Sequence, residues 1–92
     1  MAKHLNIIGR VQGVGYRFSF EMQAQTLKLS GWVRNRADGS VEAMISGDGD
    51  ALEKMIAWAW HGPAGAQVKV VAVTEVDGAL LTEGKFEILP TV

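Results

Sequence analysis

The stretch KHLNIIGRVQGVGYRFSFEMQAQTLK, residues 3–28, decides the fold because three different patterns follow one another in it. Apolar and polar residues alternate at its start, which predicts a half-buried strand over residues 3–9. Three glycines then follow without helical periodicity, so a loop is expected as far as Tyr16. Apolar side chains next recur with the spacing of one helix face, which predicts a helix over residues 17–28. The apolar positions are Leu5 and Ile7 in the strand, and Phe20, Ala24 and Leu27 in the helix.

Two more alternating segments follow this helix, at residues 32–36 and 41–46. The pair Asp38-Gly39 between them is typical of a β-hairpin turn. The alternation is expected to place Val33 on the same core-facing side as three residues of the second segment. These residues are Val41, Ala43 and Ile45.

A second helix is predicted after the hairpin. Asp50 is expected to cap it, with Glu53 three residues later in the manner of a capping box. Gly62-Pro63 is expected to end it. The apolar face of this helix consists of Leu52, Met55, Ile56 and Ala59.

The predicted elements follow the order β-α-β-β-α-β with an extra short strand. The last two strands are a valine-rich segment at residues 68–76 and a short one at residues 86–88. This order is typical of the α+β class and of the ferredoxin-like split βαβ sandwich, in which two helices cover one face of an antiparallel sheet. With 92 residues, a single domain over residues 1–92 is expected.

Composition restricts the classes of function. The chain contains no cysteine, which excludes disulfides, zinc–thiolate sites and cysteine nucleophiles. Its formal net charge of -1 lacks the basic excess of most nucleic-acid binders. No apolar run approaches the roughly 20 residues that span a bilayer, and residues 1–4 do not resemble a secretory signal. A soluble, cytoplasmic monomer without nucleic-acid or membrane partners is therefore expected.

The stretch GRVQGVGYR, residues 9–17, has the composition of an anion-binding site. Gly13 and Gly15 permit backbone conformations in which consecutive N–H groups converge on an anion. The following helix directs the positive end of its dipole to the same place, and Arg17 can bind phosphate through two charge-assisted hydrogen bonds. The stretch lacks the GxxxxGK[ST] pattern of a P-loop, so no bound Mg²⁺ is implied. By itself it also fits a glycine-rich connection that ends in a surface arginine.

Residues 9–17 resemble the first signature of the acylphosphatase family, roughly G-x-V-Q-G-V-x-[YF]-R. The family's second signature is G-W-V-x-N followed by a turn and a strand, and residues 31–35 and 38–42 are similar to it. Residues 62–68 also resemble the bacterial members, so the resemblance covers about residues 3–73. The matching positions of the first signature are Gly9, Val11, Gln12, Gly13, Val14, Tyr16 and Arg17.

The resemblance implies an enzyme that hydrolyses the carboxyl–phosphate bond of acyl phosphates by direct attack of water, without a metal or a cofactor. The family arginine that binds phosphate together with loop amides corresponds to Arg17. The family asparagine that positions and polarises the water corresponds to Asn35. Because an amide is a poor base, the implied route passes the proton of the water to the substrate phosphate itself. The implied phosphate-binding residues are Val11, Gln12, Gly13, Val14, Gly15, Tyr16 and Arg17.

Other polar residues near these two are expected to be structural. Alternation points Arg34 and Arg36 away from Asn35, where they either attract anions or solvate the sheet. His4 lies on the polar face of a strand and His61 near a helix end, so neither is expected to react. The physiological acyl phosphate stays open between 1,3-bisphosphoglycerate, carbamoyl phosphate and acetyl phosphate.

The sequence departs from the family pattern at two places. Lys28 stands where many members carry a glycine that stops the helix in a left-handed conformation, which suggests strain of about 1 kcal/mol or a shifted cap. Residues 80–92 match less well. In some relatives the C-terminus steadies the loop arginine, and no residue of this segment matches that role.

Three other functions are compatible with the same topology. A binding module would hold phosphate or carbamoyl phosphate with little turnover, as acylphosphatase-like domains fused to hydrogenase-maturation proteins handle carbamoyl phosphate. An RNA-binding domain would need exposed aromatic side chains on its central strands and a basic surface, which the pattern does not provide. A metal chaperone of this fold would need paired cysteines.

Overall fold

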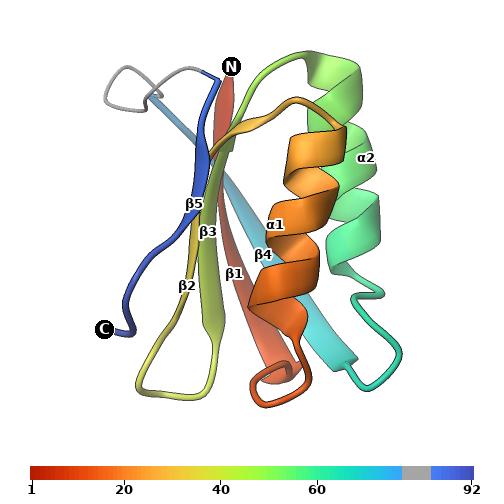
Figure 1. The fold of residues 1–92 in the computed structure, drawn as a ribbon, viewed down its shortest axis with the longest axis vertical. Helices are drawn as coiled ribbons and strands as arrows, with labels where there is room; N and C mark the ends of the chain where they lie inside the picture. Colours follow the sequence, from red (N-terminus) through yellow and green to blue (C-terminus); the bar gives the residue numbers. More distant parts are fainter. Residues whose placement is uncertain (78–83) are drawn as a thin grey trace.

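The computed structural model of the protein describes residues 1–77 and 84–92. Within these residues, two helices pack against one face of a five-stranded sheet and leave its other face open (Figure 1). The α+β, ferredoxin-like order predicted from the sequence is confirmed. The elements are β1 (Ala2–Arg10), α1 (Tyr16–Thr26), β2 (Ser30–Asn35), β3 (Val41–Ser46), α2 (Gly49–Ala59), β4 (Gln67–Val76) and β5 (Phe86–Ile88).

The strands lie side by side in the order β4-β1-β3-β2-β5. The four longer strands pair antiparallel with one another, as predicted. In contrast, β5 pairs parallel with β2, so the sheet is mixed rather than antiparallel throughout. The strand directions explain this: β4 runs opposite to β2, and β5 runs opposite to β4, so β5 and β2 run the same way.

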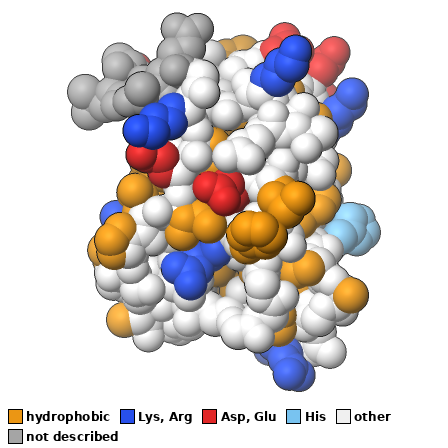
Figure 2. Space-filling model, viewed as in Figure 1, with side chains coloured by type: hydrophobic (Ala, Val, Ile, Leu, Met, Phe, Trp, Pro, Cys, Tyr) orange, Lys and Arg blue, Asp and Glu red, His pale blue; other side chains and the backbone are white. Residues whose placement is uncertain are grey.

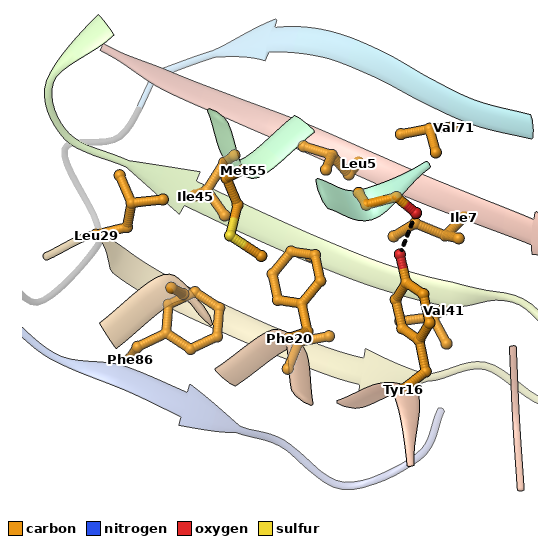
Figure 3. Close-up of a cluster of buried hydrophobic side chains, with 14 of the residues drawn as sticks. Leu5, Ile7, Tyr16, Phe20, Leu29, Val41, Ile45, Met55, Val71 and Phe86 are labelled. Carbon is orange, nitrogen blue, oxygen red and sulfur yellow. Dashed lines mark hydrogen bonds between the residues drawn. The ribbon is translucent and has the colours of Figure 1, made fainter. Parts of the chain in front are cut away.

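The hydrophobic core fills the space between the sheet and the helices (Figure 3). Phe20 of α1 lies at its centre, with its ring centroid 5.8 Å from those of both Phe86 and Trp58. The core-facing side predicted for the hairpin strands is confirmed, because all four of its residues are fully buried. These are Val33, Val41, Ala43 and Ile45.

Both helices have ends that differ from the predicted ones. α1 ends at Thr26 because Lys28 adopts a left-handed backbone with φ of 58°. The N–H groups of Lys28 and Leu29 then turn back onto carbonyl groups of the last helical turn. The cap predicted for α2 is wrong: Asp48 is the N-cap and Asp50 lies in the first turn. The helix begins earlier because the N–H of Leu52 already bonds the carbonyl of Asp48, at 2.9 Å.

Neither described helix combines the length and the apolarity that crossing a membrane would need. Of the divergent segment at residues 80–92, residues 80–83 lie outside the described part of the chain. The remainder contains β5 and then runs along the end of β2, which places it beside the site described next.

Candidate active site

The loop between β1 and α1 lies at one end of the sheet, next to the hairpin that joins β2 and β3 (Figure 1). Gly13 and Gly15 both have φ of 76°, a left-handed conformation that glycine adopts at little cost. Gly15 is also the N-cap of α1, and no side chain caps this helix. The N–H groups of residues 12–18 donate no hydrogen bond to any described part of the chain. Uncommitted N–H groups at a helix N-terminus provide an anion-binding site.

A pocket of about 220 Å³ lies between this loop, the first turn of α1 and the ends of β2 and β5. Arg17 and Asn35 both line it, although they belong to different elements and to different signatures of the sequence. The structure therefore brings the two predicted catalytic residues to one place. The complete lining is Val11, Gly13, Gly15, Tyr16, Arg17, Phe18, Asn35 and Ile88.

Arg17 is half-buried in the wall of this pocket. Among residues 1–77 and 84–92, no carboxylate forms an ion pair with its guanidinium. A partly desolvated guanidinium beside uncommitted N–H groups is arranged to receive an anion that accepts two hydrogen bonds from the planar guanidinium, as two oxygens of a phosphate do.

Asn35 reaches the pocket because of the pleat of β2. Side chains of a strand alternate between its faces, so Asn35 shares the core-facing side of Val33 and lies one step beyond the end of the core. Its Oδ1 is buried and has no hydrogen-bond partner in the described residues. An unsatisfied buried amide oxygen costs about 1–3 kcal/mol. That acceptor is therefore available for a donor that enters the pocket, such as a water molecule.

The segment after β5 holds the end of β2 that carries Asn35. The N–H of Leu89 donates to the carbonyl of Val33 at 2.9 Å, and the N–H of Val92 donates to the carbonyl of Asn35 at 3.1 Å. The carbonyl of Val92 in turn accepts the N–H of Ala37, at 2.6 Å. Residues 89–92 thus continue the pairing of β5 and fix the backbone on both sides of Asn35.

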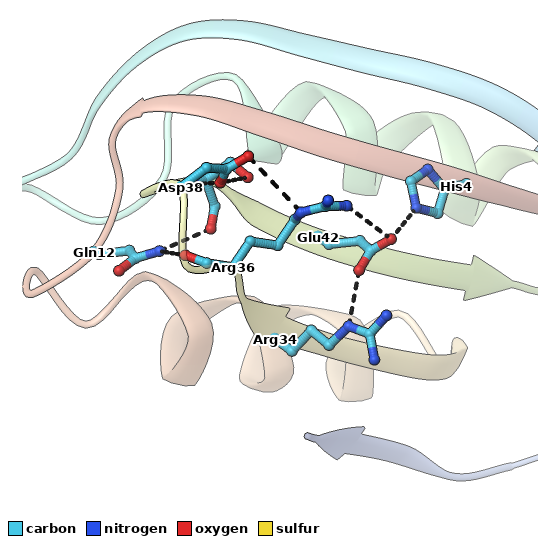
Figure 4. Close-up of polar contacts among 7 residues, drawn as sticks. His4, Gln12, Arg34, Arg36, Asp38 and Glu42 are labelled. Atoms are coloured by element: carbon cyan, nitrogen blue, oxygen red, sulfur yellow. Dashed lines mark hydrogen bonds and ion pairs between the residues drawn. The ribbon is translucent and has the colours of Figure 1, made fainter. Parts of the chain in front are cut away.

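Two of the seven residues expected to bind phosphate are not in the wall of the pocket. The side-chain amide of Gln12 donates to the carbonyl groups of Arg36 and Ser40, both at 2.8 Å (Figure 4). Gln12 therefore ties the loop to the hairpin that follows Asn35. Val14 is half-buried and packs against the core. The other five residues, Val11, Gly13, Gly15, Tyr16 and Arg17, line the pocket.

Tyr16 anchors the start of α1. Its hydroxyl donates to the carbonyl of Ala59 at the end of α2, at 2.7 Å (dashed line at Tyr16 in Figure 3). Its ring packs against that of Trp58. Burial raises the pKa of Tyr16 far above its usual range, so the phenol stays protonated. Tyr16 therefore positions Arg17, the next residue, by fixing the first turn of α1.

The arginines on either side of Asn35 lie on the open face of the sheet, as predicted (Figure 4). They converge on Glu42: the Nε of Arg34 lies 2.8 Å from Oε1, and the Nη1 of Arg36 lies 3.6 Å from Oε2. The Nε2 of His4 lies 2.7 Å from the same Oε2. Burial raises the pKa of Glu42, but the hydrogen bonds from His4 and Arg34 and the positive charge of Arg34 outweigh this effect, so the pKa lies below its usual range.

Within residues 1–77 and 84–92, the open face does not present the exposed aromatic rings on which an RNA-binding domain stacks bases. Trp32 lies there half-buried, and the guanidinium carbon of Arg34 covers its ring at 4.6 Å from the centroid. Glu42, a carboxylate, is the centre of the charged cluster. Among the described residues, no three His, Asp or Glu side chains gather in the manner of a metal site.

Two lining residues of the pocket, Phe18 and Ile88, were not among the predicted site residues. Both are apolar and exposed. Helical periodicity contains a signal for Phe18, because Phe18 and Met22 are one turn apart and lie outside the core-facing stripe of α1. Ile88 gives no such signal, since only the pairing of β5 with β2 brings it to the site.

The sequence matches the acylphosphatase family over residues 3–88. It is 54% identical over 91 residues to an acylphosphatase of Azoarcus sp. strain BH72, which covers 98% of this chain and 90% of that protein. The structure is similar to the crystal structure of acylphosphatase from Bacillus subtilis, with a TM-score of 0.85, 34% identity, and coverage of 97% of this chain and 99% of the other. It is also similar to part of full-length HypF in its phosphate- and nucleotide-bound form, with a TM-score of 0.87, 28% identity, and coverage of 98% of this chain and 12% of the other.

Proposed function

Because the chain belongs to the acylphosphatase family and is an enzyme with acylphosphatase activity, we propose that the pocket of Arg17 and Asn35 is its catalytic site. The substrate is an acyl phosphate, and the products are a carboxylate and inorganic phosphate. The observation that supports this assignment most is the meeting of three uncommitted polar groups around one pocket of about 220 Å³. These are the guanidinium of Arg17, the N–H groups of the loop and the amide oxygen of Asn35.

Arg17 and the loop N–H groups hold the phosphoryl group. Two guanidinium N–H donors bind two of its oxygens, and the N-terminal end of α1 directs its partial positive charge at the same group. These donors stabilise the negative charge that redistributes over the phosphoryl oxygens in the transition state. The carboxylate is a good leaving group, so the bond to phosphorus breaks with little help from a general acid.

Asn35 positions the attacking water. Its unpartnered oxygen accepts one O–H of the water, which directs a lone pair of the water oxygen toward phosphorus. As the new P–O bond forms, the electron pair of the old P–O bond leaves with the carboxylate. The second proton of the water passes to an oxygen of the phosphoryl group, because an amide is a poor base. Fixing the water in this way lowers the entropic part of the barrier.

The other expectations from the sequence belong to the same proposal. The enzyme acts as one catalytic domain and as a monomer, works in the cytoplasm, and needs neither a metal ion nor a nucleic-acid or membrane partner. The alternative of a phosphate-binding module with little turnover is set aside, because acylphosphatases match nearly the whole chain.

Two measurements test the proposed site. A crystal grown in phosphate is expected to hold the anion between the loop N–H groups and Arg17, and an empty pocket with the anion elsewhere contradicts the assignment. Hydrolysis of benzoyl phosphate is expected to be fast and competitively inhibited by inorganic phosphate, whereas simple phosphate esters are expected to be poor substrates.

Metal independence is tested separately by adding EDTA to the benzoyl phosphate assay. The turnover rate is expected to stay unchanged. A loss of activity that is restored by adding back a divalent cation refutes the metal-free route.

A further inference from the structure

The mouth of the proposed catalytic pocket contains two exposed hydrophobic side chains that the phosphate and water roles do not use. Phe18 of α1 is 62% exposed and Ile88 of β5 is 37% exposed, and both line the same pocket as Arg17 and Asn35. On the face seen in Figure 2, hydrophobic side chains border a Lys or Arg side chain near the middle of the view. Exposed apolar surface that is bordered by polar groups is typical of ligand-binding grooves.

The fold fixes where these two side chains lie. Phe20 points into the core, and a residue two positions away on a helix is turned by about 200°, so Phe18 faces outward. Ile88 shares one face of β5 with the buried Phe86 and pairs with Val33 of β2. It therefore lies just beyond the core, on the same face as Asn35.

The charge of the lining also restricts the acyl group. Arg17 is the one charged side chain among the described residues that line the pocket, and in the proposed mechanism the phosphoryl group occupies it. No second cation or carboxylate of the lining is left to pair with a charged acyl group. Apart from Asn35, which holds the water in the proposed mechanism, the described lining next to the phosphate position consists of apolar side chains, the ring of Tyr16 and glycine backbone.

Resting on the proposed function, we infer that Phe18 and Ile88 form an acyl subsite, so that this enzyme selects acyl phosphates with an apolar, preferably aromatic, acyl group. The phosphoryl group enters between the loop and Arg17, and the acyl carbon skeleton covers the two side chains. Small acyl groups such as acetyl leave them in water and gain little. For an acyl group with a second charge, the described lining offers no further charged side chain to pair with.

The test compares kcat/KM for benzoyl phosphate and acetyl phosphate in wild type, Phe18→Ala and Ile88→Ser. For each variant, the ratio of the two values is expected to fall by roughly tenfold, because removing apolar contacts of this size changes selectivity by that order. The fall is expected mainly in kcat/KM for benzoyl phosphate, and kcat/KM for acetyl phosphate is expected to fall less. Phe18→Leu is expected to restore part of the ratio.

Met22→Ala is the matched control, because Met22 lies one turn further along α1, is 54% exposed and does not line the pocket. Its substrate ratio is expected to equal that of wild type. Equal losses for both substrates in Phe18→Ala, or an unchanged ratio in both subsite variants, would overturn the inference. The inhibition constant of inorganic phosphate separates this failure from that of the proposed function. It is expected to stay unchanged in the subsite variants and to rise strongly in Arg17→Gln, whereas an unchanged value in Arg17→Gln refutes the proposed site instead.

Discussion

Three consecutive residues at the end of β2, Arg34, Asn35 and Arg36, experience opposite environments on the two faces of the sheet. On the open face, both arginines are bound by the carboxylate of Glu42. On the helix-covered face, the amide oxygen of Asn35 is buried without a partner, and Arg17 nearby forms no ion pair within residues 1–77 and 84–92. Polar groups that satisfy one another stabilise the fold, whereas polar groups left unsatisfied in a pocket are available to a ligand.

The largest expected effect is that of Arg17→Gln. Losing the guanidinium removes both the charge and the two-point geometry that hold the phosphoryl group, so kcat/KM for benzoyl phosphate is expected to fall by about 10³-fold or more. Arg34→Gln is the matched control, because it changes an arginine of the open face, and its kcat/KM is expected to stay close to wild type. Comparable losses of kcat/KM in the two variants would show that the two faces of the sheet do not differ in function.

Asn35→Ala is expected to lower kcat by about 10²-fold, because the water loses its orienting acceptor. The inhibition constant of inorganic phosphate is expected to change little. The free energy of unfolding of this variant is a second test of the difference between the two faces. It is expected to be unchanged or raised, because the substitution removes an unsatisfied buried oxygen. Wild-type turnover in Asn35→Ala excludes the assigned role.

Glu42→Gln is expected to reverse this pattern of effects. Stability is expected to drop by about 1–3 kcal/mol, because the variant leaves Arg34 and Arg36 without a buried counter-charge, while kcat stays near wild type. Urea unfolding and benzoyl phosphate turnover measure the two quantities. A collapse of kcat without loss of stability would place Glu42 in the catalytic machinery.

The same carboxylate predicts how stability depends on pH. The pKa of Glu42 is lower in the folded chain than its usual value, so its stabilising effect is complete above the usual range and is lost as the pH falls through the lowered pKa. In Glu42→Gln, the loss of stability on acidification is therefore expected to be shallower than in wild type. Parallel curves of unfolding free energy against pH would contradict this.

The smallest effect is expected at the end of α1, away from both faces of β2. Lys28 has φ of 58°, which strains a residue with a side chain, so Lys28→Gly is expected to raise the free energy of unfolding by about 0.5–1 kcal/mol. Thermal unfolding detects the change as a higher Tm, and the activity is expected to stay at the wild-type level. A lower Tm means that the flexibility glycine adds to the unfolded chain outweighs the strain.

Local patterns were sufficient to predict most of the elements. The alternation of residues 41–46 matches β3 at both ends, and the periodicity of Phe20 and Ala24 identified the buried face of α1. Local signals failed where two residues suited one role. Asp48 and Asp50 are both of a type that favours the N-cap position, and the first helical hydrogen bond, to the carbonyl of Asp48, decides between them. The parallel pairing of β5 depends on contacts with β2, which no pattern within three residues encodes.

The sequence by itself determined the chemistry available to this protein: a glycine loop that leads into a helix, an arginine in its first turn, and an asparagine at the end of a strand. Only the tertiary structure decided which of these groups meet. Gln12 belongs to the loop signature but donates hydrogen bonds to the hairpin, whereas Phe18 and Ile88 complete the pocket from positions outside both signatures. The physical reason is that sequence spacing fixes the direction of a side chain relative to its own element, whereas its neighbours across space depend on how the elements pack.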